Sequence, residues 1–374
     1  MKTILVFSGA AGYGHVRAAE ALCAGAQRWF PDLRCSHVDT GTLVPGLLRW
    51  VAADSYSPLV VMPWLFDIIY EFVDTLYNTR GGRVLRRWAH ARCLEGIAAV
   101  VAVQQPDAII CTHYLAAELL AALHARGTAC PPVWVHLTDC DAHAVWVQDH
   151  VAGYFAPSAC AVARLVRHGV NRTRIHLNGT PIMPAFSTPP DRAVCARELG
   201  LDPARPTVLV MGGARGAGDL TGMARAMAVR APQAQVLVLA GRNEQVRQQV
   251  MRACADLMPR VVALGYTEQI ERVMACGDVM VSKAGGLTCA ESMAMGLPMV
   301  IVPHIAGHEL PNALLLAAAG AALRPRRVRD VPDAVATLLA APQQLWHMRA
   351  AAARLARPYA ARDALAVVTG WRGV

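Results

Sequence analysis

Short apolar runs rich in β-branched residues alternate along the chain with longer stretches in which apolar residues recur at helical spacing. In the first half, residues 3–7, 108–111 and 133–137 are typical of buried strands. Residues 18–29 and 116–126 follow the first two runs and are typical of amphipathic helices. Because strand and helix alternate, the pattern predicts a parallel sheet with helices packed on its faces.

The same alternation restarts after a proline-rich passage that ends near Pro206. The predicted strands of this second half are 208–211, 235–240, 261–264, 278–282 and 299–302, and its predicted helices are 220–230, 243–257, 267–275 and 287–295. We therefore expect an α/β protein with two doubly wound domains, 1–185 and 206–345. A C-terminal helical segment, 346–374, follows, and one Ala/Arg-rich helix is predicted over 343–366.

Composition excludes a disordered chain, because 55% of the residues are hydrophobic and only 17% are charged. The formal charge of +9 suits nucleic acid, an anionic membrane surface or a phosphorylated substrate. Nucleic acid is the least favoured of these partners, since the basic residues are not interleaved with aromatic ones on a single element. The 11 cysteines form no CxxC pair and no zinc-ligand spacing, so we expect reduced thiols and a cytosolic protein. No stretch reaches the roughly 18–20 uninterrupted apolar residues of a membrane span.

The first predicted strand runs into a glycine-rich turn, SGAAGYGH, that includes Gly12 and Gly14. Such a turn lets backbone N–H groups approach an anion at a helix start, although it is equally typical of a tight structural turn. A dinucleotide fingerprint fits poorly, because Arg17 occupies the position of its third glycine. His15 ends the turn, and an imidazole there can take a proton from an attacking hydroxyl or serve a purely structural role.

Two further glycine turns follow strands in the second half. Residues 212–218 contain four glycines, which favours a phosphate-sized anion held on backbone amides. The next turn contains Gly285 and Gly286, and Glu291 lies about one turn into the helix that follows. Its carboxylate could accept hydrogen bonds from ribose hydroxyls or simply favour the helix dipole. His308, Glu309 and Asn312 come after the next strand, as candidate sugar contacts or as a capped loop.

Several segments in order carry a family resemblance. They are SKAGGLTCAESMAMGLPMVI and AGHELPN in the second half, and THY at 112–114, TDCDAHAVW at 138–146 and NGTPIMPAF at 178–186 in the first. These segments resemble GT-B glycosyltransferases of the group that contains monogalactosyldiacylglycerol synthases and processive diacylglycerol glucosyltransferases. The resemblance implies two Rossmann-like domains facing a central cleft, an inverting reaction, and a UDP-sugar donor in place of any cofactor.

The resemblance also implies roles for individual residues. Donor contacts would come from Gly212, Gly213, Tyr266, Gly285, Gly286, Leu287, Thr288, Glu291, His308, Glu309 and Asn312, with Tyr266 beside the base and Glu291 on the ribose. Acceptor contacts would come from Gly14, Asp139, His143, Trp64 and Phe66, and His15 would act as the catalytic base or orient the acceptor. The chain departs from the group where AAGYGH replaces the commoner GGGH and where His308 replaces glutamine. The second change alters the hydrogen-bonding groups that face the sugar.

Residues 43–77 are rich in apolar and aromatic side chains, and a basic cluster follows them between Arg80 and Arg92. This combination suits a surface that dips into lipid headgroups while its cations face anionic lipid, or else an ordinary buried helical pair. The family resemblance favours the lipid surface. We therefore expect peripheral association with the inner face of the cell membrane.

Together these observations predict transfer of a hexose, from UDP-galactose or UDP-glucose, to diacylglycerol. The alternatives are a polyprenyl-linked or small hydrophobic acceptor, and a protein that binds nucleotide sugars or lipid without catalysis. The Asp-x-Asp element, Asp139 to Asp141, falls in the acceptor half of the chain. We therefore expect no metal requirement.

Overall fold

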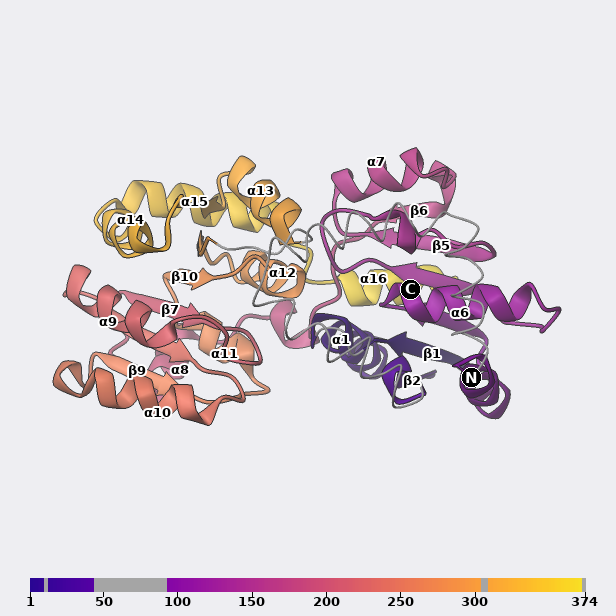
Figure 1. Cartoon of the computed structure of the whole chain (residues 1–374), viewed down its shortest axis with the longest axis horizontal. Coiled ribbons are helices and arrows are strands. Elements are labelled where there is room, and N and C mark those ends of the chain that lie inside the picture. Colours follow the sequence, from indigo (N-terminus) through magenta and orange to yellow (C-terminus); the bar gives the residue numbers. More distant parts are fainter. Residues whose placement is uncertain (10–12, 44–92, 304–308, 372–374) are drawn as a thin grey trace. The chain divides into compact units, whose positions relative to one another are not determined.

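The computed structural model describes residues 1–9, 13–43, 93–303 and 309–371 (Figure 1). The chain divides into two compact units. The first unit consists of Met1–Pro184, Ala306–Pro311 and Arg357–Val374, and the second consists of Ala185–Ile305 and Asn312–Ala356. No helix within the described ranges is long and apolar enough to cross a membrane.

The first unit contains a parallel six-stranded sheet in the order β2-β1-β3-β4-β5-β6. The strands are β1 (Lys2–Ser8), β2 (Leu33–Asp39), β3 (Ala108–Cys111), β4 (Val133–His136), β5 (Val151–Ala156) and β6 (Ile175–Leu177). Because every strand runs in the same direction, the carboxyl ends of all six lie at one edge of the sheet.

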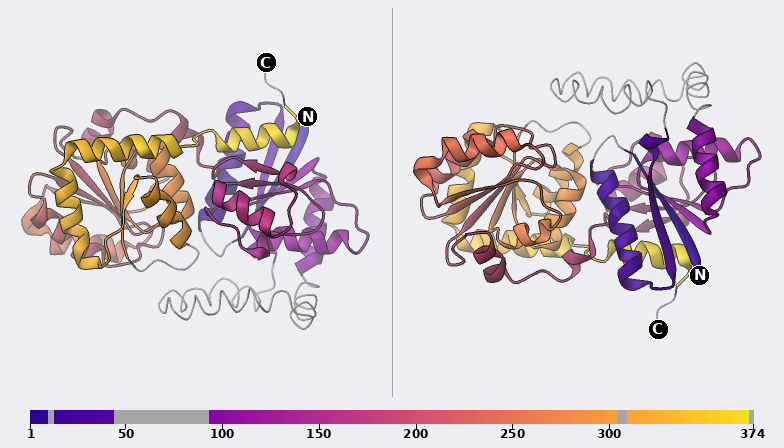
Figure 2. Two further views of the ribbon diagram at one scale, coloured as in Figure 1. Left: turned by 90° about the horizontal axis from the view of Figure 1, so that it is seen from above. Right: turned by 90° about the horizontal axis from the view of Figure 1, so that it is seen from below.

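Helices cover both faces of this sheet (Figure 2). They include α1 (Tyr13–Trp29), α6 (Tyr114–His124), α7 (Ala159–Arg167) and α16 (Ala360–Thr369). Successive side chains of β1 alternate between two cores: Ile4 packs in the cluster that contains Leu365 of α16, whereas Leu5 packs in the cluster that contains Leu119 of α6. The strand is therefore apolar from Ile4 to Phe7, as expected for a parallel sheet buried on both sides.

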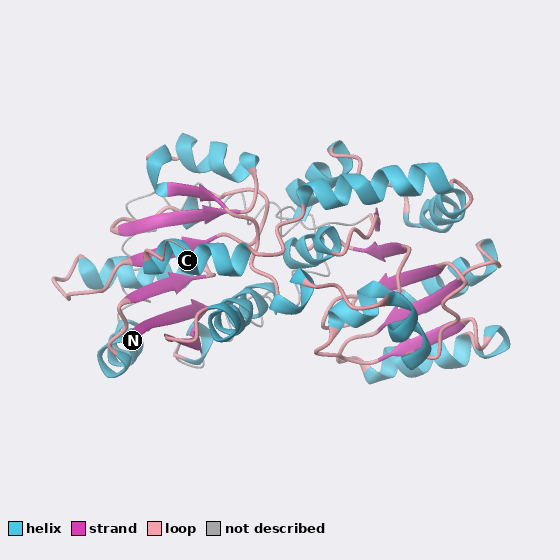
Figure 3. Cartoon of the chain, turned by 180° about the vertical axis from the view of Figure 1, so that it is seen from behind, coloured by secondary structure: helices cyan, strands magenta, loops and turns pink. Residues whose placement is uncertain are grey.

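The second unit contains another parallel six-stranded sheet, in the order β12-β11-β10-β7-β8-β9. Figure 3 distinguishes the strands of both units from their helices by colour. Its strands are β7 (Thr207–Met211), β8 (Gln235–Leu239), β9 (Val261–Leu264), β10 (Val279–Ser282), β11 (Met299–Ile301) and β12 (Ala322–Leu323). Its helices are α8 (Arg192–Glu198), α9 (Leu220–Arg230), α10 (Glu244–Ala253), α11 (Ile270–Ala275), α12 (Gly286–Ala294), α13 (Leu310–Ala318), α14 (Val331–Leu339) and α15 (Pro342–Leu355). The prediction of two doubly wound α/β domains is confirmed.

The predicted single helix over 343–366 is wrong. Two helices, α15 and α16, occupy this stretch, and they belong to different units. The break follows from Pro358, which has no N–H to donate and disfavours helical geometry in the residue before it. The helix after the first glycine turn begins at Tyr13 rather than at residue 18, so Gly14 and His15 lie in its first turn.

Several elements had no sequence-based prediction, among them β5, β6 and α8. A glycine, Gly153, interrupts the apolar run of β5, and a Cβ there would lie 2.4 Å from Cζ3 of Trp134. The missing side chain therefore makes room for the Trp134 ring on the neighbouring strand. α8 lies in the linker-like passage and is capped by Asp191, whose carboxylate accepts from the N–H of Val194.

Candidate functional site

His15 is held in one orientation at the carboxyl edge of the first sheet. Its Nδ1 lies 2.7 Å from the carbonyl oxygen of Thr112, which follows β3, and 3.2 Å from Oγ1 of Thr138, which follows β4. A carbonyl oxygen can only accept, so Nδ1 carries the hydrogen that is donated to it. The neutral ring therefore has its basic lone pair on Nε2, the tautomer that a general base requires.

A second imidazole, His113, lies beside His15. The two rings are nearly perpendicular, with centroids 4.8 Å apart. His113 caps α6, since its Nδ1 accepts from the N–H of Leu115 at 3.3 Å. Burial, and secondarily the proximity of His15, hold the pKa of His113 well below its usual value, so this ring is neutral.

A glycine makes this arrangement possible. A Cβ at Gly9 would lie 2.6 Å from Cγ of His113, closer than any side chain tolerates. Gly9 comes directly after β1, and its bare backbone allows the His113 ring to approach the end of that strand. Gly9, in the predicted glycine turn, therefore has a definite packing function in the first unit.

The remaining predicted acceptor residues are only partly assembled around His15. Gly14 precedes it in the first turn of α1, and Asp139 follows Thr138 and is half-buried. His143 caps a short 3₁₀ turn, Ala144–Trp146, by accepting from the N–H of Val145 at 3.3 Å, and so has a structural role as well. Trp64 and Phe66 lie outside the described residues, as does His308 of the donor set.

In the second unit, the glycine loop 212–218 connects β7 to α9. Gly213, Gly216 and Gly218 have φ values of 69°, 61° and 92°, which are left-handed conformations. A Cβ at Gly216 would lie 2.2 Å from the carbonyl oxygen of Ala240, at the end of β8. The loop therefore packs with its bare backbone against the end of the neighbouring strand.

The contact is reinforced from the β8 side. Gly241 has a φ of 61°, and a Cβ there would lie 2.5 Å from the carbonyl oxygen of Ala214. The N–H of Arg242 donates to the same oxygen at 2.9 Å. Two successive strand ends are thus locked together through glycines at the sheet edge where open α/β folds bind ligands.

Sequence reasoning missed three cations at this edge: Arg215, Arg242 and Lys283 are all exposed and follow the ends of β7, β8 and β10. Cε of Lys283 is the nearest atom, at 3.9 Å, to a Cβ built on Gly213. The signal that could have found them is a basic residue within a few positions of a strand end, repeated on adjacent strands. Cations and bare N–H groups side by side suit a diphosphate.

The Arg242 guanidinium also lies 4.3 Å from the centroid of the Tyr266 ring, which follows β9 and is 40% exposed. This cation–π contact fixes an aromatic face at the same edge. Such a face can support a planar base.

α12 begins at the third predicted glycine turn, which contains Gly285 and Gly286. Gly285 is its N-cap, and no side-chain hydrogen bond caps the helix start. The backbone N–H groups of Gly286, Leu287 and Thr288 therefore belong to the positive end of the helix dipole. Glu291 lies in the next turn and is only 5% exposed, so its carboxylate is buried close to that end.

Asn312 and Glu309, near the start of α13, are both buried. The side-chain amide of Asn312 donates to the carbonyl oxygen of Ala284 at 2.9 Å and so ties α13 to the turn before α12. The amide nitrogen of Asn312 thus bonds to the protein backbone. Among the described residues, no cluster of three His, Cys, Asp or Glu side chains could hold a metal ion.

Comparison with known proteins agrees with these two units. The family model of monogalactosyldiacylglycerol (MGDG) synthase matches residues 15–182, and that of the glycosyltransferase family 28 C-terminal domain matches residues 207–362. The chain is a GT-B glycosyltransferase. The predicted resemblance to the diacylglycerol-glycosylating group is confirmed.

Relatives match this glycosyltransferase over nearly its whole length. The processive diacylglycerol β-glucosyltransferase of Bacillus subtilis is 25% identical and covers 93% of this chain and 90% of its own. Monogalactosyldiacylglycerol synthase 1 of Arabidopsis thaliana is 29% identical and covers 96% of this chain and 69% of its own.

Two solved structures share the fold. MurG of Acinetobacter baumannii has a TM-score of 0.63 at 17% identity, over 99% of this chain and all of its own. HepE of Anabaena, solved in complex with UDP-glucose, has a TM-score of 0.57 at 15% identity, over 99% of this chain and all of its own.

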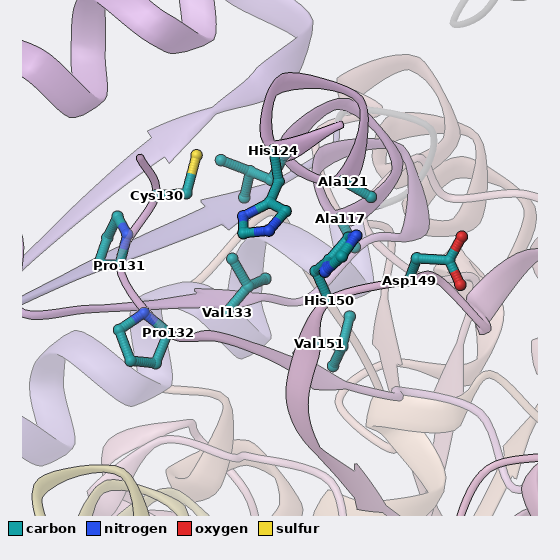
Figure 4. A pocket seen from close by; sticks show the side chains of 11 residues that line it. Ala117, Ala121, His124, Cys130, Pro131, Pro132, Val133, Asp149, His150 and Val151 are labelled. Atoms are coloured by element: carbon teal, nitrogen blue, oxygen red, sulfur yellow. The ribbon is translucent and has the colours of Figure 1, made fainter. Parts of the chain in front are cut away.

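A separate pocket of about 200 Å³ lies at the opposite edge of the first sheet, where β4 and β5 begin (Figure 4). The rings of His124 and His150 line it, with centroids 3.9 Å apart. Since His15 lies beyond the carboxyl ends of the strands, this pocket is not part of the candidate active site.

Proposed function

We propose that this glycosyltransferase transfers a hexose from UDP-galactose or UDP-glucose to the hydroxyl of diacylglycerol, with inversion at the anomeric carbon. The observation that carries the proposal is the hydrogen bond from His15 Nδ1 to the Thr112 carbonyl, because it makes Nε2 the basic atom of the ring. The named substrates of the relatives support a lipid acceptor.

The second unit binds the donor. Backbone N–H groups of Gly212, Gly213 and the α12 start, from Gly285 to Thr288, surround the diphosphate, and Lys283 adds positive charge. Glu291 accepts hydrogen bonds from the ribose, Tyr266 supports the base, and His308, Glu309 and Asn312 contact the hexose or the phosphates. These groups stabilise the negative charge that grows on the departing UDP.

The first unit binds the acceptor beside Gly14, Asp139 and His143, with Trp64 and Phe66 toward the lipid. His15 Nε2 removes the proton of the acceptor hydroxyl as its oxygen attacks the anomeric carbon. The bond from that carbon to the diphosphate oxygen breaks, and UDP leaves with the electron pair. A single displacement of this kind inverts the anomeric centre, and it needs no metal ion.

The +9 charge and the aromatic-rich stretch 43–77 support peripheral binding to an anionic lipid surface. The site of action is then the inner face of the cell membrane, where both a water-soluble donor and a lipid acceptor are within reach.

The decisive experiment is a donor screen with UDP-glucose, UDP-galactose and UDP-N-acetylglucosamine against diacylglycerol in mixed micelles, with products identified by mass. We expect hexosyl-diacylglycerol from one of the first two donors. If product forms only with a polyprenyl-linked acceptor, that lipid replaces diacylglycerol as the proposed acceptor. If UDP binds but no acceptor gives turnover, the chain is a binding protein.

A further inference from the structure

We infer that Thr138 is the positioning residue of the catalytic base: its hydroxyl oxygen accepts from His15 Nδ1–H and stabilises the imidazolium that forms during transfer. The inference rests on the proposed function, since it assigns a role in that reaction to a residue that does not itself touch a substrate.

Thr138 is built into the protein for such a role. It follows β4, is only 4% exposed, and places Oγ1 3.2 Å from His15 Nδ1. Its backbone carbonyl accepts from Oγ1 of Thr180 at 3.3 Å, which connects it to the segment after β6. Because the Nδ1 hydrogen is already donated to the Thr112 carbonyl, Thr138 Oγ1 can only be a second acceptor of the same hydrogen.

Thr112 also fixes the position of His15, through two hydrogen bonds. Its hydroxyl donates to the backbone carbonyl of His15 at 2.8 Å, while its own carbonyl accepts from the ring. The first turn of α1 and the end of β3 are therefore joined at two points. Thr138 adds the end of β4 as a third support.

The Thr112 carbonyl oxygen and Thr138 Oγ1 stabilise the His15 ring most strongly after proton transfer. When Nε2 takes the acceptor's proton, the ring becomes a cation, and hydrogen bonds to a charged group are about twice as strong as those to a neutral one. The stabilisation therefore grows from the ground state to the transition state. Interactions of that kind raise kcat rather than lower KM.

Among the described residues, the titratable and charged groups on the elements that hold this ring include His113 and Glu118 of α6, His136 on β4, Asp139 and His143 after it, and Arg28 and the Arg17–Glu20 ion pair on α1. His113 is kept neutral by burial, so an imidazolium on His15 meets no second cation there. Two neutral oxygens thus take the place that a carboxylate occupies in a catalytic triad.

The test compares Thr138→Val, which keeps the branched shape and removes the oxygen, with Thr138→Ser, which keeps the oxygen. In the donor and acceptor assay above, we expect Thr138→Val to lose about tenfold in kcat, the effect of one hydrogen bond of about 1.4 kcal/mol, with KM for the UDP-sugar little changed. The acid limb of its pH–rate profile should move to lower pH, because the imidazolium is less stabilised. Thr138→Ser should recover most of the lost rate.

Thr180→Val is the matched control, because it removes a hydroxyl bonded to the same segment without touching His15; we expect its pH profile to be unchanged. Thr138→Ala is measured in parallel, so that a valine variant that fails to fold leaves a second test. A normal kcat and pH profile in folded Thr138→Val or Thr138→Ala, beside an inactive His15→Ala, would overturn the role of Thr138 alone. Full activity in His15→Ala would overturn the proposed base itself.

Discussion

Replacing Gly216 by alanine tests whether the glycine loop 212–218 binds UDP. Gly216 has a φ of 61°, and its new Cβ would lie 2.2 Å from the carbonyl oxygen of Ala240. The left-handed conformation costs an alanine about 1–2 kcal/mol, and the overlap adds about 1–3 kcal/mol if the loop stays in place. The loop therefore moves away from the end of β8 and takes its N–H groups with it.

We expect UDP affinity, measured by calorimetry, to fall about 10–100-fold, since each tenfold corresponds to about 1.4 kcal/mol. Gly200→Ala is the matched control, because Gly200 also has a positive φ, 72°, but nothing lies within 4 Å of its new Cβ. That variant should lose about 1–2 kcal/mol of stability and keep its UDP affinity. Gly241→Ala attacks the same contact from the β8 side and should resemble Gly216→Ala.

The reasoning would be refuted if folded Gly216→Ala and Gly241→Ala bound UDP as tightly as the unmodified protein. Thermal unfolding of each variant separates this result from a loss of fold. In that case the glycines would serve only to pack β7 and β8 together.

Three other predictions follow from the site and its surroundings. Glu291→Gln, which removes a buried charge, should weaken UDP binding about tenfold without preventing folding; unchanged affinity by calorimetry would remove Glu291 from the ribose site. EDTA should leave transfer activity unchanged, and a loss restored by magnesium or manganese would contradict the metal-independent mechanism. The carboxylate of Asp278 accepts hydrogen bonds from Arg192 at 2.6 Å and from Arg349 at 2.5 Å. Burial raises the pKa of Asp278, but the hydrogen bonds from Arg192 and from the backbone lower it by more, so its pKa lies below the usual value. Asp278 therefore stabilises the fold fully above the ordinary carboxyl pKa of about 4, and this stabilisation is lost as the pH falls through the lowered pKa. In acid denaturation followed by circular dichroism, the stability of Asp278→Asn should depend less steeply on pH in that range than the stability of the unmodified protein.

Strong local patterns predicted much of the second unit. The helix expected over 220–230 and the strand expected over 261–264 match α9 and β9, because both have clear apolar periodicity and capped or turn-bounded ends. Weak local patterns failed: β6 has only three residues, and Gly153 interrupts β5. Such strands form because neighbouring strands and helices bury them, and a single-sequence pattern does not contain that information.

The residues of the candidate site also fall into those that local sequence indicated and those that it did not. Glycine turns and the residue types at strand ends indicated His15, Glu291 and the candidate phosphate-binding loops, since those signals are local in sequence. The partners of His15 were not readable, because Thr112 and Thr138 lie 97 and 123 residues away along the chain.

The amino-acid sequence alone determined the two α/β halves and the positions of the glycine turns, because hydrophobic periodicity and turn chemistry act over a few residues. The family followed from the resemblance of its motif segments to known glycosyltransferases. Tertiary structure alone decided that α16 returns to the first unit, that Arg242 stacks on Tyr266, and which nitrogen of His15 carries its proton. The last two depend on strand order in a parallel sheet. Crossover connections bring distant segments to one edge, and only there do their backbone oxygens and side chains meet.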